Sequence, residues 1–282
     1  MLKQRVMTAL VLAAVFVLAL FYLPVPLFSA FVATIVLISA WEWANLSGFS
    51  KPWQRVIYVA LQAVCILGVA YFIGIIQPDA TLAVGATERY QAVLLVGCSW
   101  WALALLWVQG YPSSALLWGR RVMRALMGFF VLIPTWAAFS YVRSHDSGAW
   151  LVLLIVAVVA AADIGGYFVG RKFGRHKLAP NVSPGKTWEG FLGGVAANAI
   201  VGAVLWLLTG NALWAVIALV ITTSLASVLG DLLESMVKRE RGIKDSSSLL
   251  PGHGGVLDRV DSLTAAAPVF ALILIALELR FG

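Results

Sequence analysis

Apolar stretches long enough to cross a bilayer recur along the chain, separated by short polar segments. A membrane-spanning helix needs about 20 predominantly apolar residues. A β-barrel would instead alternate apolar and polar residues over segments of about ten residues. The pattern therefore predicts an all-α polytopic membrane protein with nine transmembrane helices, over residues 7–23, 27–47, 56–76, 90–109, 122–140, 149–169, 190–209, 212–230 and 261–279.

Composition agrees with this pattern. Hydrophobic residues make up 61% of the 282 residues and charged residues only 12%, whereas a soluble domain carries about 25% charged residues. We expect an N-terminal region of about five spans, 1–145, and a C-terminal region, 146–282, that holds the catalytic site. Two connections in the second region are long and polar, 170–189 and 231–260, and only these offer room for a sizeable site.

The basic residues predict how the chain crosses the membrane, because cytoplasmic loops are enriched in Lys and Arg. If the N-terminus is cytoplasmic and nine spans alternate, 17 of the 20 basic residues lie on the inner side, and only Arg89, Arg143 and Arg280 lie outside. The C-terminus is then outside and both long connections are cytoplasmic. The same topology, with attraction to anionic lipid headgroups, accounts for the net charge of +7 without nucleic-acid binding.

Carboxylates are concentrated where the last two predicted spans meet the cytoplasm. Asp258 and Asp261 are three residues apart and share one face of a helix. Asp231 lies at the inner end of the preceding span, followed one turn later by Glu234. If these spans pack together, Asp231, Asp258 and Asp261 converge as hard oxygen ligands of the kind that Mg²⁺ takes. The alternative is that Asp258 pairs with Arg259 or caps the helix.

The segment between these carboxylates combines cations with glycines. Glycines let backbone N–H groups approach phosphate oxygens closely, while Lys and Arg neutralise phosphate charge. Carboxylates beside cations suggest a site where a metal ion bridges phosphate oxygens. His253 could act as an acid, donate a hydrogen bond to phosphate or anchor the loop by a hydrogen bond, and on its own the anchor is favoured. The predicted catalytic residues are Asp231, Lys238, Arg239, Lys244, Asp245, His253, Asp258, Arg259 and Asp261.

The connection 170–189 is the second basic loop. Within it, the piece from Pro180 to Thr187, which ends in Gly-Lys-Thr, nearly matches a Walker A loop. Pro180 stands where the first glycine belongs and no strand is expected before it, so we reject a P-loop. A second phosphate-contacting loop and a loop that binds lipid headgroups both remain open. The residues predicted to bind substrate, here and in the first segment, are Asp163, Arg171, Lys172, Ser183, Lys186, Thr187, Glu189, Ser235, Gly254 and Gly255.

A further acid, Glu42, lies near the inner end of the second span. Ionisable residues at membrane depth are costly and usually face a cavity or a partner. Glu42 either joins the site or pairs with a cation from a neighbouring loop, and the sequence does not decide between the two.

Residues 235–261, SMVKRERGIKDSSSLLPGHGGVLDRVD, resemble the signature of phosphatidate cytidylyltransferases, also called CDP-diacylglycerol synthases, at all 27 positions. The pieces DIGGYFVGRKFG, LAP and SPGKTWEG, within residues 163–190, are similar to another block of that family. The resemblance is concentrated in the last 120 residues, and the first 140 residues add only their hydropathy pattern to it. The resemblance implies transfer of the cytidylyl group of CTP to phosphatidic acid, which yields CDP-diacylglycerol and pyrophosphate. It also implies a requirement for Mg²⁺, with a second, monovalent cation left open.

The expected partners are therefore CTP, phosphatidic acid and the lipid bilayer, with a homodimer left open and nucleic acid excluded. The expected location is the bacterial cytoplasmic (inner) membrane, with the active site facing the cytoplasm. Two alternatives remain. A kinase related to the CTP-dependent polyprenol and dolichol kinases would use CTP as a phosphoryl donor. An ion-coupled transporter would use the intramembrane acids as an ion path, but it would not explain the loop of glycines and histidine.

Overall fold

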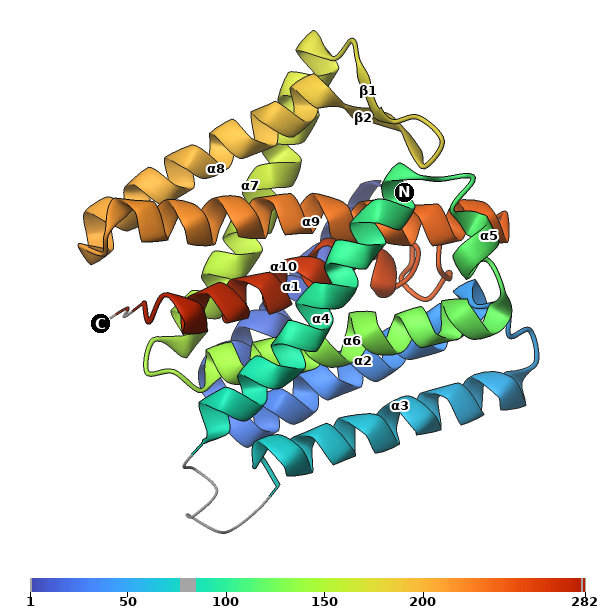
Figure 1. Ribbon diagram of the computed structural model, residues 1–282, viewed down its shortest axis with the longest axis horizontal. Helices are drawn as coiled ribbons and strands as arrows, with labels where there is room; N and C mark the ends of the chain where they lie inside the picture. The colour runs from blue at the N-terminus through green and yellow to red at the C-terminus, as the bar shows by residue number, and fades with distance from the viewer. Residues whose placement is uncertain (1, 77–84, 280, 282) are drawn as a thin grey trace.

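Helices make up most of the computed structural model, which describes residues 2–76, 85–279 and 281 (Figure 1). The predicted all-α class is confirmed. Eight of the helices are long and apolar enough to cross a membrane, and Val6–Tyr22 of the first helix forms a shorter apolar segment. The helices are α1 Leu2–Tyr22, α2 Val25–Leu46, α3 Pro52–Ile73, α4 Ala86–Gln109, α5 Ala115–Trp118, α6 Arg121–Arg143, α7 Gly148–Phe173, α8 Trp188–Thr209, α9 Leu213–Arg241 and α10 Leu257–Ala276.

The long helices alternate in direction, so their connections gather at two opposite ends. The ends of α2 and α9 and the starts of α3 and α6 lie at the right of Figure 1. The turns α6–α7 and α8–α9 and the C-terminus lie at the left. The boundary predicted between residues 1–145 and 146–282 falls in the turn between α6 and α7.

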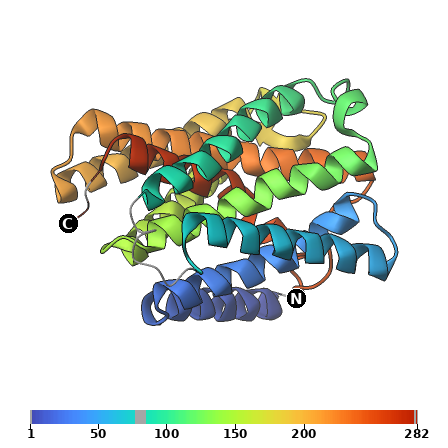
Figure 2. The ribbon, with the colours of Figure 1, turned by 60° about the horizontal axis from the view of Figure 1, so that its bottom comes forward.

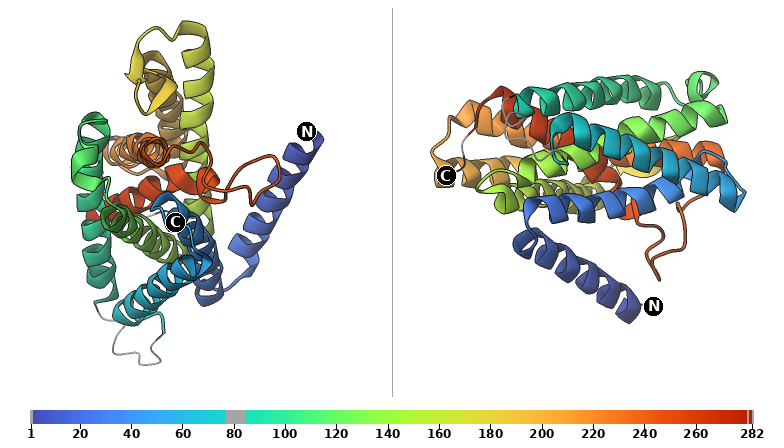
Figure 3. Two further views of the ribbon diagram at one scale, coloured as in Figure 1. Left: turned by 90° about the vertical axis from the view of Figure 1, so that its right-hand side faces the viewer. Right: turned by 90° about the horizontal axis from the view of Figure 1, so that it is seen from below.

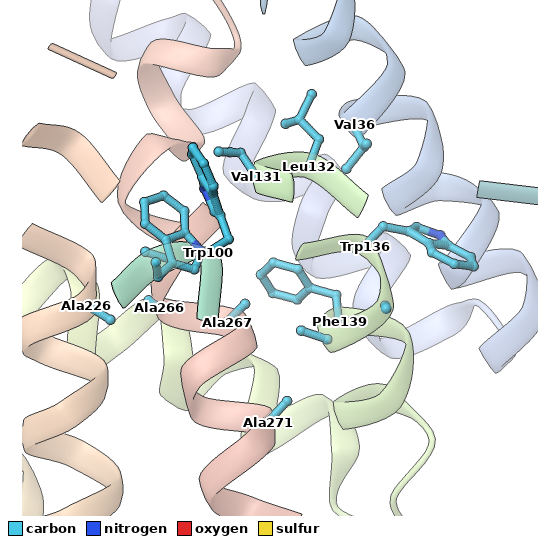
Figure 4. Close-up of a cluster of buried hydrophobic side chains, with 14 of the residues drawn as sticks. Val36, Trp100, Val131, Leu132, Trp136, Phe139, Ala226, Ala266, Ala267 and Ala271 are labelled. Carbon is cyan, nitrogen blue, oxygen red and sulfur yellow. The ribbon is translucent and has the colours of Figure 1, made fainter. Parts of the chain in front are cut away.

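The core lies where α2, α4, α6 and α10 meet. Helix α6 is its central helix, because 72% of an 18-residue apolar stretch of α6 is buried inside the protein. Figure 4 shows Trp136 and Phe139 of α6 within this core, and the side chains of Ala266 and Ala267 on α10 beside Trp100 of α4. Alanines on α10 bring its backbone close to the bulky side chains, and small residues at helix interfaces permit such close packing in membranes.

The first helix lies at the edge of the bundle, below α2 in Figure 2. Both views of Figure 3 show it leaning away from the other helices. Its C-terminal end is attached to the core: Leu20 is buried, and Arg143 at the end of α6 donates hydrogen bonds to the carbonyl oxygens of Leu20 and Leu23, at 3.0 and 3.2 Å.

A small antiparallel hairpin projects beyond the helices between α7 and α8. Its strands are β1 Lys177–Ala179 and β2 Ser183–Thr187, with Lys177 opposite Thr187 and Ala179 opposite Ser183. The expectation that no strand precedes the Gly-Lys-Thr sequence is therefore wrong. The P-loop is still not formed, because Gly-Lys-Thr belongs to the second strand of the hairpin. Thr187 caps α8 by accepting a hydrogen bond from the Gly190 backbone N–H at 3.1 Å.

The two polar connections are shorter than predicted. Helix α9 continues to Arg241, and α10 begins at Leu257, so the segment 231–260 reduces to a loop over 242–256. Similarly, α7 continues to Phe173 and α8 begins at Trp188. Hydropathy falls where charged side chains begin, but the backbone hydrogen bonds of a helix continue past them. Gly242, with φ of 72°, ends α9 in the left-handed conformation common after helices.

Candidate active site

Helices α9 and α10 approach each other backbone to backbone at Gly230. A Cβ atom at this position would overlap the main-chain oxygen of Asp261 and lie 3.1 Å from the Cα of Ser262. The condition on which the convergence of the carboxylates depended, contact between the last two spans, is therefore met. Their contact brings Asp231, Glu234 and Lys238 of α9 beside the first turns of α10.

Lys238 is the cation at the centre of this contact. Its Nζ atom lies 2.7 Å from Asp258 Oδ1 on α10 and 3.4 Å from Glu234 Oε2, one turn earlier on α9. The side chains of Lys238 and Asp258 are 12% and 7% exposed. The alternative in which Asp258 pairs with Arg259 is wrong, because Arg259 instead donates to the main-chain oxygen of His253, at 2.7 and 3.2 Å.

The loop before α10 closes around the Asp258 carboxylate. The backbone N–H of Ser246 donates to both carboxylate oxygens, at 3.0 and 3.2 Å, and that of Gly255 donates at 2.8 Å. Gly254 has φ of 84°, and a Cβ atom there would lie 2.8 Å from Asp258 Oδ2. A side chain at Gly254 would therefore be strained by its backbone and crowded by Asp258.

Glu234 and Asp261 form the buried acidic part of the site. Glu234 is only 2% exposed, and neither of its carboxylate oxygens accepts a hydrogen bond from the described residues. The Asp261 carboxyl group interacts with three charged side chains of α9, namely Asp231, Glu234 and Lys238. Across residues 2–76, 85–279 and 281, no three Asp, Glu, His or Cys side chains are placed to hold a metal ion together. The predicted convergence of Asp231, Asp258 and Asp261 on one ion is thus not preformed.

The hairpin brings a second lysine to α9. Lys186 Nζ on β2 lies 2.7 Å from Asp231 Oδ2, and Ser235 Oγ donates to Asp231 Oδ1 at 3.1 Å. Arg239 holds the tip of the hairpin by donating from Nε to the main-chain oxygen of Val182 at 3.2 Å. The site therefore contains two lysine–carboxylate pairs, one contributed by the hairpin and one by the contact of α9 with α10.

Two adjoining cavities are lined in part by the hairpin. The smaller, about 360 Å³, is lined mainly by apolar residues and glycines, and Asp163, Arg171 and Lys186 are its charged lining residues. The larger, about 590 Å³, is mainly apolar and lies between α4, α9 and the hairpin. Both are lined in part by the same residues, Leu178, Phe191 and Val228. A cavity with charged lining residues next to one that has none is suited to a molecule with a charged head and an apolar body.

A third cavity, about 590 Å³, lies within the loop that joins α9 to α10. Five residues predicted to be catalytic or substrate-binding line it: Lys244, Asp245, His253, Gly254 and Arg259. His253 Nδ1 is 3.4 Å from the main-chain oxygen of Pro251, so this side chain contacts its own loop, as expected of an anchor. The structure thus brings these five residues together at the polar end of the protein.

Some predicted substrate-binding residues make contacts that stabilise the hairpin and its flanks. Glu189 accepts hydrogen bonds from the backbone N–H groups of Arg175 and His176, and its Oε1 lies 2.7 Å from His176 Nδ1. Lys172 Nζ lies 5.2 Å from the centre of the Phe173 ring. Ser183 pairs with Ala179, and Thr187 caps α8. Substrate binding by these residues stays a prediction.

Two residues of this region were not among the predicted site residues. Ser246 contacts Asp258 from the loop, and Glu42 reaches the same loop from α2. The polar run Asp245–Ser248 indicated a hydrogen-bonding loop but not which hydroxyl contacts the carboxylates. The position of Glu42 in an apolar span marked it as unusual, but its partners are more than 200 residues away along the chain.

The fold and site define a polytopic helical membrane protein with lysine–carboxylate pairs and glycine-rich backbone at one end of its helices. Residues 3–277 match the cytidylyltransferase family, so the chain belongs to that family and is a nucleotidyltransferase. It is 43% identical over 277 residues to a protein named phosphatidate cytidylyltransferase from Pseudomonas aeruginosa, with 97% of each chain covered. A protein of the same name from Haemophilus influenzae is 41% identical over 286 residues, covering 96% of this chain and 98% of that one. An uncharacterised protein, YnbB, from Escherichia coli is 35% identical over 260 residues, covering 83% of this chain and 80% of that one.

Proposed function

We propose that this enzyme transfers the cytidylyl group of CTP to phosphatidic acid and forms CDP-diacylglycerol and pyrophosphate. The observation that carries the proposal is nearly full-length identity of 43% and 41% to two proteins named phosphatidate cytidylyltransferase. The geometry supports it, because the pairs Lys238–Asp258 and Lys186–Asp231 lie at the same end of the helices. Two adjoining apolar cavities, one of which also has charged lining residues, suit a lipid with a phosphate head.

The reaction is a displacement at phosphorus. An oxygen of the phosphatidate monoester attacks the α-phosphorus of CTP and forms the new P–O bond. The bond from the α-phosphorus to the oxygen that bridges to the β-phosphorus breaks, and pyrophosphate leaves with that electron pair. The attacking phosphate is already ionised, so no side chain needs to remove a proton. The main task of the protein is to bring two polyanions together and offset their repulsion.

Lys186, Lys238 and Arg239 are the cations that we assign to this task. Each now contacts a carboxylate or a main-chain oxygen, and phosphate oxygens are acceptors of the same kind. Arg171 and Asp163, which line the smaller cavity with Lys186, are the residues that we assign to the lipid phosphate end of the site.

Magnesium belongs to the same proposal. Asp231, Asp258 and Asp261 would hold it, with Glu234 beside them as a buried carboxylate that accepts no hydrogen bond from the described residues. These hard oxygen ligands fit the ion, whose charge would stabilise the phosphates of CTP. Lys186 and Lys238 neutralise two of these carboxylates in the protein alone, and a cation bound to those carboxylates would leave the two lysines available to phosphate.

We place the site on the cytoplasmic face of a bacterial inner membrane. The distribution of 17 basic residues of 20 on the inner side supports this orientation. It gives the site access to cytosolic CTP and to phosphatidate of the inner leaflet. One substrate cannot leave the bilayer, which explains why a nucleotidyltransferase is embedded in it.

The position of a radioactive phosphorus tests the reaction. Purified protein is given phosphatidic acid and CTP labelled at either the α- or the γ-phosphorus. Cytidylyl transfer predicts that only the α-label enters the lipid and that unlabelled pyrophosphate is released with it. Lipid labelled from the γ-position would instead establish a CTP-dependent kinase. Ion flux in liposomes without nucleotide turnover would favour a transporter.

A further inference from the structure

Glu42 is a buried carboxylate with four hydrogen-bond donor groups of one distant segment within reach. It lies on α2 and is 1% exposed. Oε1 accepts from Ser247 Oγ at 2.6 Å and from the Val256 N–H at 3.0 Å. Oε2 accepts from Ser246 Oγ at 3.2 Å and from the Leu257 N–H at 2.7 Å. Each oxygen therefore binds one hydroxyl and one backbone amide.

No lysine or arginine among the described residues forms an ion pair with this carboxylate. Its compensation comes from the start of α10. The first backbone N–H groups of a helix have no partner within it and carry the positive end of the helix dipole. Val256 at the N-cap of α10 supplies no side-chain cap. Glu42 thus provides from α2 the cap that the local sequence of α10 lacks.

The loop approaches Glu42 closely because it has a glycine at the point of contact. A Cβ atom on Gly255 would lie 2.7 Å from both carboxylate oxygens of Glu42 and would overlap Ser246 Oγ. Any larger residue there would push the loop away from α2. The contact between the loop and Glu42 therefore requires a glycine at position 255.

Ser246 connects Glu42 to the proposed site. Its hydroxyl lies 3.2 Å from Glu42 Oε2 and 3.0 Å from Asp258 Oδ2. A hydroxyl has a single proton and can donate to only one of these carboxylates at a time. The Ser246 backbone N–H also donates to Asp258, which in turn binds Lys238. A continuous chain of contacts therefore runs from α2 through the loop to the lysine of α9.

We propose that Glu42 is a positioning residue for cytidylyl transfer. It fixes the loop between α9 and α10 and, through Ser246, orients the carboxylate of Asp258. This role rests on the proposed function, because it acts on the site assigned to that reaction. It does not require Glu42 to touch either substrate, since its four donors already occupy both oxygens.

Kinetics of purified Glu42→Gln, Glu42→Asp and Ser246→Ala proteins test this role. Gln has one amide oxygen for four donors, so kcat should fall by about tenfold to a hundredfold. Glu42→Asp keeps the charge and should recover part of that loss. Ser246→Ala keeps the helix cap but removes the bridge, and it should lower kcat while the KM for CTP changes less. The double variant Glu42→Gln/Ser246→Ala should lose less than the product of the two single losses, because both act on Asp258.

The matched control is Ser39→Ala, one turn earlier on α2. Ser39 is buried, and its hydroxyl has no hydrogen-bond partner in the part of the chain that the structure describes. Its removal should leave the activity unchanged. If Glu42→Gln does not fold, the activity of Ser246→Ala tests the positioning role, since this variant leaves Glu42 and its cap on α10 in place. Activity of folded Ser246→Ala within about twofold of wild type, or independent losses in the double variant, would overturn the positioning role. Absence of CDP-lipid synthesis by the wild-type protein would overturn the proposed function itself.

Discussion

The Nζ atom of Lys238 lies 2.7 Å from Oδ1 of Asp258, and this ion pair joins α9 to α10 in the interior of the protein. A second carboxylate, Glu234, shares the same ammonium group at 3.4 Å. Lys238 therefore neutralises two buried acids in the protein without substrates. The same cation is one that we assign to phosphate, so its loss should affect both stability and catalysis.

Lys238→Ala should destabilise the fold and reduce activity. Removing one partner of a buried pair leaves an uncompensated charge and costs about 3–5 kcal/mol. Thermal unfolding in detergent measures this loss, and Lys244→Ala, which removes an exposed lysine of the adjoining loop, should change the unfolding temperature little. An unfolding temperature of Lys238→Ala equal to that of wild type would show that the pair is not needed for stability.

Lys186→Ala should lower catalytic activity while the stability of the fold changes little. Lys186 and Asp231 are 26% and 28% exposed, and such pairs contribute only about 0–1 kcal/mol to stability. Losing a charge-assisted bond to phosphate should lower kcat/KM by about tenfold to a hundredfold.

The control for Lys186 is Lys177→Ala on the neighbouring strand, where Nζ donates to the main-chain oxygen of Pro184 at 2.7 Å. Lys177 is outside the proposed site, and its loss should leave kcat/KM near that of wild type. Equal losses in the two variants would mean that the lysines support the hairpin and that Lys186 has no particular role with phosphate.

Reporters of membrane sidedness should place the loop 242–256 in the cytoplasm and the C-terminus outside. The physical reason is the retention of Lys and Arg on the cytoplasmic side. A reporter inserted in the loop and another fused after residue 282 measure the two positions separately. A loop on the outer side would remove the site from cytosolic CTP and contradict the enzyme orientation.

The sequence predicted the approximate positions of the long helices because apolar runs of membrane length carry that information. The carboxylates at the ends of the last two predicted spans also indicated where a site would form if those spans packed together, as they do. The prediction ended α9 eleven residues early, at 230 instead of Arg241, because hydropathy falls at Asp231 while the backbone remains helical. The hairpin was missed because both of its strands are short and the second contains Pro184 and Gly185, residue types that seldom occur within strands.

The sequence could not predict which lysine pairs with which carboxylate in the site, for a different reason. Lys186 and Asp231 are separated by α8 and most of α9, and their contact depends on how the hairpin folds over α9. The partners of Glu42 belong to a loop whose path depends on glycines at 254 and 255. Residue types and spacings indicated which groups carry chemistry, whereas the tertiary packing determines which lysine meets which carboxylate.

The central claim is that the carboxylates at the contact of α9 with α10 support cytidylyl transfer. Its most direct test measures pyrophosphate and CDP-diacylglycerol together, with phosphatidic acid, CTP and Mg²⁺, in wild-type, Asp258→Asn and Asp261→Asn proteins. The amide introduced by Asp258→Asn would still offer an oxygen to the N–H groups of the loop, and Lys238 would keep Glu234, so folding should be retained. Wild type should release the two products in equal amounts, and both variants should fall by several orders of magnitude, at about 1.4 kcal/mol per decade. Near-normal turnover by folded Asp258→Asn and Asp261→Asn proteins would contradict the account.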